Sequence, residues 1–488
     1  MKRNIAPSTN LVESLRDMGY TLDTALADVV DNSISSGATR IAIYASPETP
    51  SRIAIADNGR GMSEQQILQA LTLAFYSRDM VRSSNDLGRY GMGMKTASWS
   101  QCRRFTILSS MNGVVNAATV DLDQIREQQT WEAEFLTAEQ IDALPDRSLL
   151  LGNGTLLIWE KLDRVVNDAD TKAQTELASK LNQAAEHLEV IFHRFMVSEA
   201  PYPKITITIN GRELKPFDPF CSKHPATQQS AEEVIPLGSN GSVKVQAFTL
   251  PHHDRLSSVE NSRLAGPEGY LRNQGFYLYR ERRLILKGTW FRLKKPHPSL
   301  NLARIRIDIP NSMDDRWHIN IIKSSAQPPR EVRERLRRIV DTLGSHSQKV
   351  YKQKGFTQDQ GGLFPVWKTR QVGGVTSYEL SDEHPLIRGF IDELSDDHKR
   401  KLKSILQLIT SSLPLDSISV SIGNAPGSVK GETMDTSSLY ELLDSVWDKR
   451  PSDNVEELVD LLSTVEPYKS NRDSVLEYFQ IKLQGDEE

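Results

Sequence analysis

An acidic and an amide side chain, Asp28 and Asn32, lie four residues apart in a segment whose apolar spacing predicts a helix. Residues at this spacing share one face of a helix. A carboxylate one turn away from an amide can hold a water molecule and a metal ion side by side. Such pairs are also common on solvated helix faces, so the pair alone does not decide between the two interpretations.

A second stretch, Asp57-Asn58-Gly59-Arg60-Gly61-Met62, directly follows an apolar run of strand length. An aspartate that ends a strand, followed by two alternating glycines, lets the backbone approach a flat ligand closely. The alternative interpretation is a strand-to-helix turn in which the asparagine is a cap.

A third stretch contains Gly88, Gly91 and Gly93 and leads into a predicted helix. The amides of such a loop, together with a helix N-terminus, can cradle phosphates. The stretch lacks the Gly-Lys-Ser/Thr of a Walker loop and does not follow a strand, as a dinucleotide fingerprint would. A fourth stretch, Gly154-Thr155, stands at the head of a predicted strand and by itself indicates only the end of a loop.

Alternating helices and strands must position these four stretches. Apolar residues three and four apart predict a helix over residues 22–36, and Ser63 with Gln66 forms the capping pair of a second helix over 63–75. The remaining elements of this segment are strands over 39–44, 52–56, 105–108 and 155–159, and a long amphipathic helix over 171–195.

Two further segments follow. Alternating apolar residues over 204–209 before Asn210-Gly211 predict a hairpin, strands are expected over 275–286 and 303–309, and a charged helix over 328–344. After a polar boundary at 345–365, helices are expected over 395–411 (with Ser395 as N-cap), 436–449 and 454–464, and a strand over 417–422. The predicted domains are residues 1–200, 201–350 and 351–488, in agreement with about 150 residues per domain.

Composition restricts the setting more than the activity. The chain has 488 residues, two cysteines and a formal net charge of -5, and no stretch that predicts a signal peptide or a membrane span. A reducing, cytoplasmic location is expected. The net charge hides one uneven region, which we call the basic ribbon. It comprises Arg272, Arg280, Arg282, Arg283, Lys287, Arg292, Lys294, Lys295, Arg304 and Arg306, with Glu281 as the only acidic residue between them.

Five aromatic residues are interleaved with the basic ribbon: Phe276, Tyr277, Tyr279, Trp290 and Phe291. Basic side chains with aromatics between them can hold nucleic-acid phosphates and bases. The alternative is a strand surface whose charges pair with acidic neighbours. We expect DNA binding by residues 272–306.

The order and spacing of the four stretches resemble the N, G1, G2 and G3 boxes of the GHKL ATPases. This superfamily includes topoisomerase ATPase subunits, MutL proteins, large heat-shock chaperones, MORC proteins and histidine kinases. The resemblance covers about residues 11–165. It implies an α/β fold of α+β sandwich type, namely a Bergerat-type domain that binds ATP and Mg²⁺.

The resemblance also implies roles for individual residues. Asn32 would bind Mg²⁺, Asp57 would accept a hydrogen bond from the adenine amino group, and Thr155 would support the adenine pocket. Gly59, Gly61 and Met62 would line the base. The phosphates would be held by Gly88, Gly91, Met92, Gly93, Met94 and Lys95, with residues 76–90 as a lid.

One position departs from the pattern of the superfamily. Members that hydrolyse ATP usually have Glu four residues before the N-box Asn, whereas this chain has Asp28. We expect Asp28 to be the general base, with slow turnover because its side chain is one methylene shorter and must still reach its water at about 2.6–3.2 Å. Asp31 is the adjacent alternative, and its other interpretation is a hydrogen-bonding role.

Residues 204–344 resemble the ribosomal-protein-like transducer domain of MORC-like proteins, and Lys323 would bind the γ-phosphate or, alternatively, be an exposed loop lysine. The closest resemblance is to prokaryotic MORC-related proteins of restriction or phage defence. The mainly helical C-terminal region would serve protein interaction. These features imply a homodimer that forms on ATP binding and clamps DNA. The alternatives are a non-catalytic switch that recruits nuclease or helicase partners, and a chaperone-like clamp on proteins.

Overall fold

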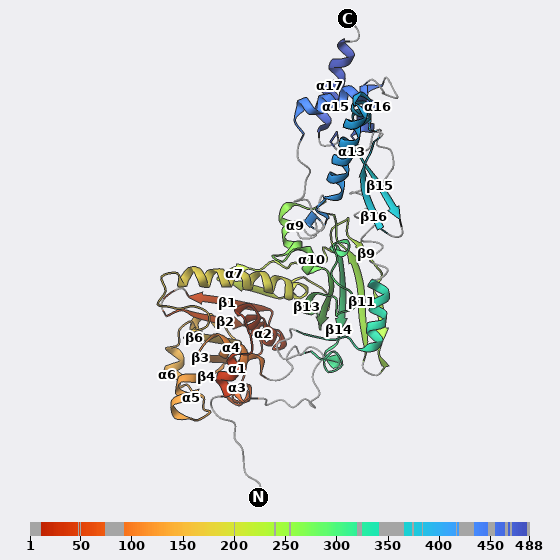
Figure 1. Ribbon diagram of the computed structural model, residues 1–488. Coiled ribbons are helices and arrows are strands. Elements are labelled where there is room, and N and C mark those ends of the chain that lie inside the picture. The colour runs from red at the N-terminus through yellow and green to blue at the C-terminus, as the bar shows by residue number, and fades with distance from the viewer. Residues whose placement is uncertain are drawn as a thin grey trace. The chain divides into compact units, whose positions relative to one another are not determined.

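A mixed sheet of eight strands contains Asp57 and Thr155, and helices α2 and α4 pack in the same region (Figure 1). This computed structural model describes residues 11–46, 48, 50–73, 92–199, 201–238, 241–252, 255–319, 325–340, 366–372, 375–382, 384–415, 417–418, 434–447, 454–463, 467–468 and 471–485. The chain forms two compact units. The first comprises Met1–Pro251, Arg272–Pro296 and Leu302–Gly344, and the second comprises His252–Leu271, His297–Asn301 and Ser345–Glu488.

The first sheet has the strand order β5-β4-β3-β6-β2-β1-β7-β8. Its strands are β1 (Arg40–Ser46), β2 (Arg52–Asp57), β3 (Arg104–Met111), β4 (Val114–Asp121), β5 (Glu134–Phe135), β6 (Gly154–Glu160), β7 (Thr206–Ile209) and β8 (Arg212–Glu213). The helices of this region are α1 (Leu11–Arg16), α2 (Leu22–Ser35), α3 (Glu64–Leu71), α4 (Gly93–Gln101), α5 (Leu122–Gln128), α6 (Ala138–Asp142), α7 (Ala173–Ile191) and α8 (His193–Met196).

Both faces of the first sheet are covered, which explains why β2 and β6 are apolar almost throughout. Alternate side chains such as Ile53 and Ile55 face a large core shared with α2, α4 and α7. The intervening side chains, such as Ala54 and Ala56, join a smaller cluster that includes Ile141 of α6.

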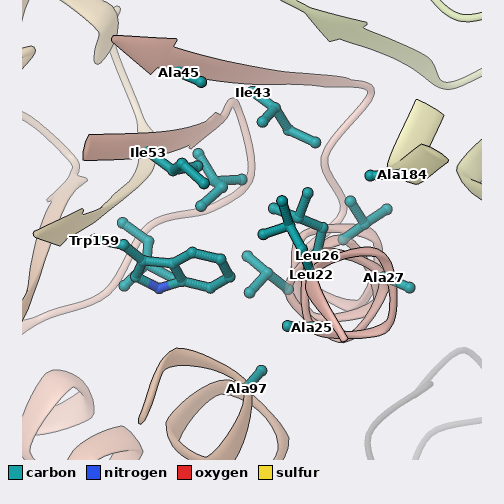
Figure 2. Close-up of a cluster of buried hydrophobic side chains, with 14 of the residues drawn as sticks. Leu22, Ala25, Leu26, Ala27, Ile43, Ala45, Ile53, Ala97, Trp159 and Ala184 are labelled. Carbon is teal, nitrogen blue, oxygen red and sulfur yellow. The ribbon is translucent and has the colours of Figure 1, made fainter. Parts of the chain in front are cut away.

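Helix α2 is held by small residues on several sides. Figure 2 shows Leu22 and Leu26 facing the strand side chains Ile43, Ile53 and Trp159. Alanines at the contacts let neighbouring helices approach closely, and all four of the following are fully buried: Ala25 and Ala27 of α2, Ala97 of α4 and Ala184 of α7. Interiors packed at this density resist small shifts of an element. The position of α2 is therefore tightly defined.

The local signals in this region are confirmed. Helix α2 and strands β1, β2 and β6 lie where the spacing of apolar residues places them. Ser63 is the N-cap of α3: its hydroxyl accepts from Gln66 N at 3.3 Å, while Gln66 Oε1 accepts from Ser63 N at 2.9 Å. Strands β4 and β5 and helices α5 and α6 were not predicted.

The predicted hairpin at Asn210-Gly211 forms, but β7 pairs in parallel with β1 and so extends the first sheet. The sequence analysis had assigned this hairpin to the second segment. Ile207 and Ile209 belong to the core of the first sheet, which accounts for the pairing. The second sheet accordingly begins after this hairpin and not at residue 201.

The second sheet has the order β10-β11-β14-β12-β13, with β9 paired to β11. Its strands are β9 (Gln228–Gln229), β10 (Glu233–Pro236), β11 (Ser242–Thr249), β12 (Gly275–Arg280), β13 (Arg283–Thr289) and β14 (Ala303–Ile309). The segment expected as strand over 275–286 is a hairpin whose turn residues Glu281 and Arg282 both have positive φ, as tight hairpin turns require. Residues 330–340 are helical.

The second unit contains a two-stranded sheet of β15 (Trp367–Val372) and β16 (Val375–Leu380). Its helices include α9 (Ser258–Ala265), α12 (Pro385–Glu393), α13 (Asp396–Ser411), α15 (Thr436–Trp447), α16 (Val455–Leu462) and α17 (Arg472–Gly485), while α10 (Tyr270–Asn273) precedes β12. Leu443, Val459 and Phe479 join α15, α16 and α17 in one core. Ser417 and Ile418 are helical, so the predicted strand over 417–422 is wrong there, and its other residues lie outside the described ones. Among the described residues, no helix has both the length and the apolar character needed to cross a bilayer.

Candidate functional site

Asp57, the last residue of β2, has both carboxylate oxygens held in place. Oδ1 accepts from Gly59 N at 2.8 Å, and Oδ2 accepts from the hydroxyl of Ser33 on α2 at 2.8 Å. Burial raises the pKa of this carboxyl, and hydrogen bonds from Gly59, Ser33 and the backbone of Thr155 oppose the shift. Asp57 is thus a fixed acceptor where β2 meets α2.

Two glycines let backbone segments meet tightly around Asp57. At Gly61, φ is +73°, and a Cβ there would lie 1.9 Å from the carbonyl oxygen of Ser110. At Gly154, φ is +147°, and a Cβ would lie 2.0 Å from the carbonyl oxygen of Asp57. No other residue type fits either position without moving the backbone.

A serine that was not predicted links the second and fourth stretches. Ser109 of β3 accepts from Met62 N at 2.8 Å, donates to Gly154 O at 2.9 Å and lies 3.0 Å from the hydroxyl of Thr155. Met62 also packs against the core of the first sheet. The link depends on the pairing of β3 with β6, so no local pattern in the sequence could have identified it.

Asn58 has a structural role, but not the capping role of the alternative interpretation, because the N-cap of α3 is Ser63. The Oδ1 of Asn58 accepts from Thr39 N at 2.9 Å and from Arg40 N at 2.8 Å, which ties the turn to the start of β1. The stretch is therefore a strand-to-helix turn that is fixed to the neighbouring strand.

Asp28 is buried on α2 beside the first residue of α4. The hydroxyl of Tyr20 donates to Asp28 Oδ2 at 2.8 Å. Burial, followed by the charge of Asp28, raises the pKa of this tyrosine well above its ordinary value. A Cβ built on Gly93 would lie 3.6 Å from the same Oδ2, so α4 begins beside the carboxylate with room for one more carbon atom between them. Tyr20 was not predicted either, because it precedes α2 and carries no motif.

Asn32 is exposed on α2, one turn after Asp28. Its Nδ2 donates to the carbonyl oxygen of Asp28 at 2.9 Å. This hydrogen bond fixes the orientation of the amide and makes Oδ1 the atom that can bind a cation. Hard oxygen ligands of this kind suit Mg²⁺.

Asp31, the alternative base, lies against Arg283 of β13. Arg283 Nε is 3.1 Å from Asp31 Oδ1 and 3.0 Å from Oδ2, and only 1% of Asp31 is exposed. Arg283 therefore engages both carboxylate oxygens of Asp31, whereas Asp28 is the acid of α2 that lies beside the start of α4.

The structure describes only some of the residues that were expected to hold phosphates. Met92 is the N-cap of α4, Gly93 begins the helix, and Met94 packs against the core. Lys95 is buried, and its ammonium donates to the carbonyl oxygens of Ala70 at 2.6 Å and Thr72 at 3.0 Å, at the end of α3. Gly88, Gly91, the predicted lid over 76–90 and Lys323 lie outside the described residues.

The basic ribbon is not one continuous surface, which corrects the sequence analysis. Arg280, Arg283 and Arg304 are buried. Arg282 pairs with Glu199, and Arg306 pairs with Glu232 and Asp308. The aromatics Phe276, Tyr277, Tyr279 and Trp290 are buried as well. β12 and β14 lie inside the second sheet, so the aromatic side chains belong to the interior, and the arginines pair with acids of this sheet and of the first-sheet region.

The exposed members of the ribbon are Arg272, Lys287, Arg292, Lys294 and Lys295. Three of them lie between Phe291 and Pro296, immediately after β13. Among the described residues, no group of three or more His, Cys, Asp or Glu side chains could hold a metal ion.

Comparison with known families identifies the segment that contains this site. Residues 20–150 match the family model described as "Histidine kinase-, DNA gyrase B-, and HSP90-like ATPase". The match supports a GHKL-type ATP-binding domain in this part of the chain. It includes α2, β2, α3, α4 and β3, and so contains Asp28, Asn32, Asp57 and Gly93. A comparison with curated proteins gives no match.

The buried ammonium of Lys95 makes a prediction for stability against pH. Burial lowers the pKa of Lys95 to about 8 from 10.5. Between these values the unfolded chain binds more protons at this position than the folded one, so stability should rise with pH. Relative to Lys95→Met, the wild-type protein should gain about 3 kcal/mol of unfolding free energy between pH 8 and 10.5. Urea titrations of both proteins at pH 7, 8.5 and 10 measure this gain, and a difference that does not change with pH would contradict it.

Proposed function

We propose that this protein binds ATP with Mg²⁺ and hydrolyses it slowly. The observation that carries the proposal is the placement of α2. Through Ser33 this helix contacts Asp57, and it places Asp28 beside the first residue of α4. One rigid helix therefore joins an acceptor suited to a nucleobase with a helix N-terminus suited to phosphates. The family match over residues 20–150 supports the same assignment.

The base would lie against β2. Asp57 would accept from the adenine amino group, while Gly59, Gly61 and Met62 line the ring and Thr155 supports the pocket. A carboxylate at this position selects adenine over guanine, because the guanine oxo group would meet it as acceptor against acceptor. The hydrogen bonds from Ser33 and Gly59 hold the carboxylate in position for this contact.

The phosphates would lie at the start of α4. The first amides of a helix lack partners within it and attract anions. Gly88, Gly91, Met92, Gly93, Met94 and Lys95 would contribute backbone groups. The ammonium of Lys95 is engaged with α3, so its contribution would be to order the end of that helix. Asn32 Oδ1 would bind Mg²⁺, which would supply positive charge to neutralise the phosphates.

Hydrolysis would use Asp28 as the base. A water molecule attacks the γ-phosphorus and passes its proton to Asp28, and the bond to the β-phosphate oxygen breaks to leave ADP and phosphate. The side chain of Asp is shorter than that of Glu, but Gly93 brings the start of α4 next to the carboxylate. Tyr20 already donates to Oδ2, which stabilises the ionised form of Asp28 and favours slow turnover.

Two substitutions on α2 separate binding from chemistry. Asp28→Asn should leave ATP affinity intact and lower kcat by about 10²–10⁴-fold, because it removes only the base. Asn32→Ala should abolish binding of Mg-ATP. Isothermal titration with a non-hydrolysable analogue and a phosphate-release assay measure the two effects. Normal affinity in Asn32→Ala would sink the nucleotide assignment, and unchanged turnover in Asp28→Asn would move the base elsewhere.

We extend the proposal to an ATP-gated homodimer, with Lys323, which lies outside the described residues, binding the γ-phosphate. Contact of two parts of the chain with one phosphate would join them only while that phosphate remains. The molar mass should therefore be that of a dimer with a non-hydrolysable ATP analogue and that of a monomer with ADP. Light scattering measures this, with Asn32→Ala as the control that should not respond. A mass that is independent of nucleotide would exclude the gate.

A second candidate function is a non-catalytic switch that recruits nuclease or helicase partners. The shorter base and its hydrogen bond to Tyr20 favour it. ATP-dependent dimerisation without turnover, with or without DNA, would distinguish this switch from the slow ATPase.

DNA remains the proposed partner, as for a MORC-like clamp in phage defence. The proposed DNA-binding surface now comprises only the exposed members of the basic ribbon. Lys294→Glu with Lys295→Glu should weaken DNA binding and lower the slope of log K against log salt by about 0.9 for each lost phosphate contact. Arg400→Glu with Lys401→Glu on α13 makes the same charge change at another exposed place and should leave the slope unchanged. Fluorescence anisotropy at several salt concentrations measures both. Absence of DNA binding by the wild-type protein at low salt would favour a clamp on protein clients.

A further inference from the structure

Arg283 of the second sheet contacts two carboxylates of α2, the helix that carries the proposed base. We propose that Arg283 is a positioning residue that couples the second sheet to the orientation of Asp28. This inference rests on the proposed function, because it concerns the hydrolysis step at the same site.

The contacts of Arg283 are unequal, and the difference defines its role. Its Nε lies 3.1 and 3.0 Å from the two oxygens of Asp31. Its NH2 lies 3.9 Å from Asp28 Oδ1, an ion pair without a close hydrogen bond. Arg283 therefore binds Asp31 directly. It acts on Asp28 mainly through its charge and through α2, the helix that carries both aspartates. It does not touch the reacting atoms directly, so it is a positioning residue and not a catalytic one.

Electrostatics makes this arginine necessary where it is. Asp28 and Asp31 are three residues apart on one helix, and 6% and 1% of their surfaces are exposed. Two buried carboxylates at this spacing repel each other and lack the water that would otherwise stabilise them. The side chain of Arg283, also 6% exposed, supplies the neutralising charge from another part of the chain. The counter-charge for this face of α2 is therefore carried by β13.

The guanidinium is fixed to its own strand and not only to α2. Arg283 NH1 donates to the carbonyl oxygen of Leu284 at 3.0 Å, and its Cζ lies 5.8 Å from the centre of the Phe192 ring, just after α7. Arg283 is also the first residue after the tight turn at Glu281 and Arg282. A side chain whose guanidinium is anchored by these two contacts at the start of a strand moves with that strand. A displacement of β13 would therefore be transmitted to α2.

The neighbouring Arg280 provides a matched comparison. It is equally buried and donates to both oxygens of Asp314 at 2.7 and 2.8 Å. Both members of that pair belong to the second-sheet region, so the pair stabilises the sheet without reaching α2. Loss of either arginine removes the guanidinium that neutralises a buried carboxylate, which is costly for folding. Only loss of Arg283 should alter catalysis as well.

The test compares Arg283→Gln with Arg280→Gln in the full chain. Arg283→Gln should lower kcat for ATP by about 100-fold, as a misplacement of about 1 Å can, while the affinity for a non-hydrolysable analogue stays unchanged. Arg280→Gln should lower the urea midpoint to a similar extent and leave kcat unchanged. Equal loss of kcat in both variants, or wild-type kcat in Arg283→Gln, would overturn the proposal.

A double variant separates positioning from stability. Adding Asp31→Asn to Arg283→Gln removes the unpaired charge and should restore the urea midpoint, whereas kcat should stay low. Recovery of kcat together with the midpoint would show a merely structural role and overturn the proposal. Arg283→Lys keeps the charge and should retain most of the turnover, and it also serves if the glutamine variant does not fold. A wild-type protein that binds no nucleotide would instead refute the proposed function itself.

Discussion

The burial of acidic side chains on α2 is the constraint on which the site depends. A carboxylate removed from water needs a partner, and each buried acid here finds one in a different part of the fold. Asp28 accepts a hydrogen bond from the hydroxyl of Tyr20, and Asp31 accepts one from the guanidinium of Arg283. Asp57, at the end of β2, accepts a hydrogen bond from the hydroxyl of Ser33, which belongs to α2 itself. These partners fix the helix in translation and rotation at once, while the alanines around it let the sheet and the neighbouring helices pack close.

Local signals were sufficient to predict the elements that carry the site. The spacing of Leu22, Leu26 and Val29 predicts α2, and the pair Ser63 and Gln66 predicts the start of α3. Both signals act within a few residues of the chain, and such short-range preferences can be read without knowledge of the fold. The sequence also pointed to Asp28, Asn32 and Asp57, whose roles remain part of the proposed function.

The residues that support the site could not be predicted, because their partners are distant in the sequence. Ser109 reaches Gly154 only because β3 pairs with β6, and Arg283 reaches Asp31 from the second sheet. The prediction that the basic ribbon forms one exposed surface was wrong for a related reason. Net charge along a segment does not reveal which side chains point inward, and Arg280 and Arg304 prove to be buried. The alternation of side-chain types within β12 and β14 was visible in the sequence, but the burial of the side chains on both faces of these strands was not.

The parallel pairing of β1 with β7 has a consequence for how the protein is made. β1 lies near the N-terminus, and its partner is synthesised only after the whole intervening helix α7. Until then one edge of β1 is open, and an open edge is a template for pairing with other chains. Closing so large a loop also delays folding, since contacts between distant residues form slowly. A nascent chain that has not yet exposed residue 209 therefore carries a nearly complete nucleotide domain with one unprotected strand, which is the stage at which a chaperone would be most useful.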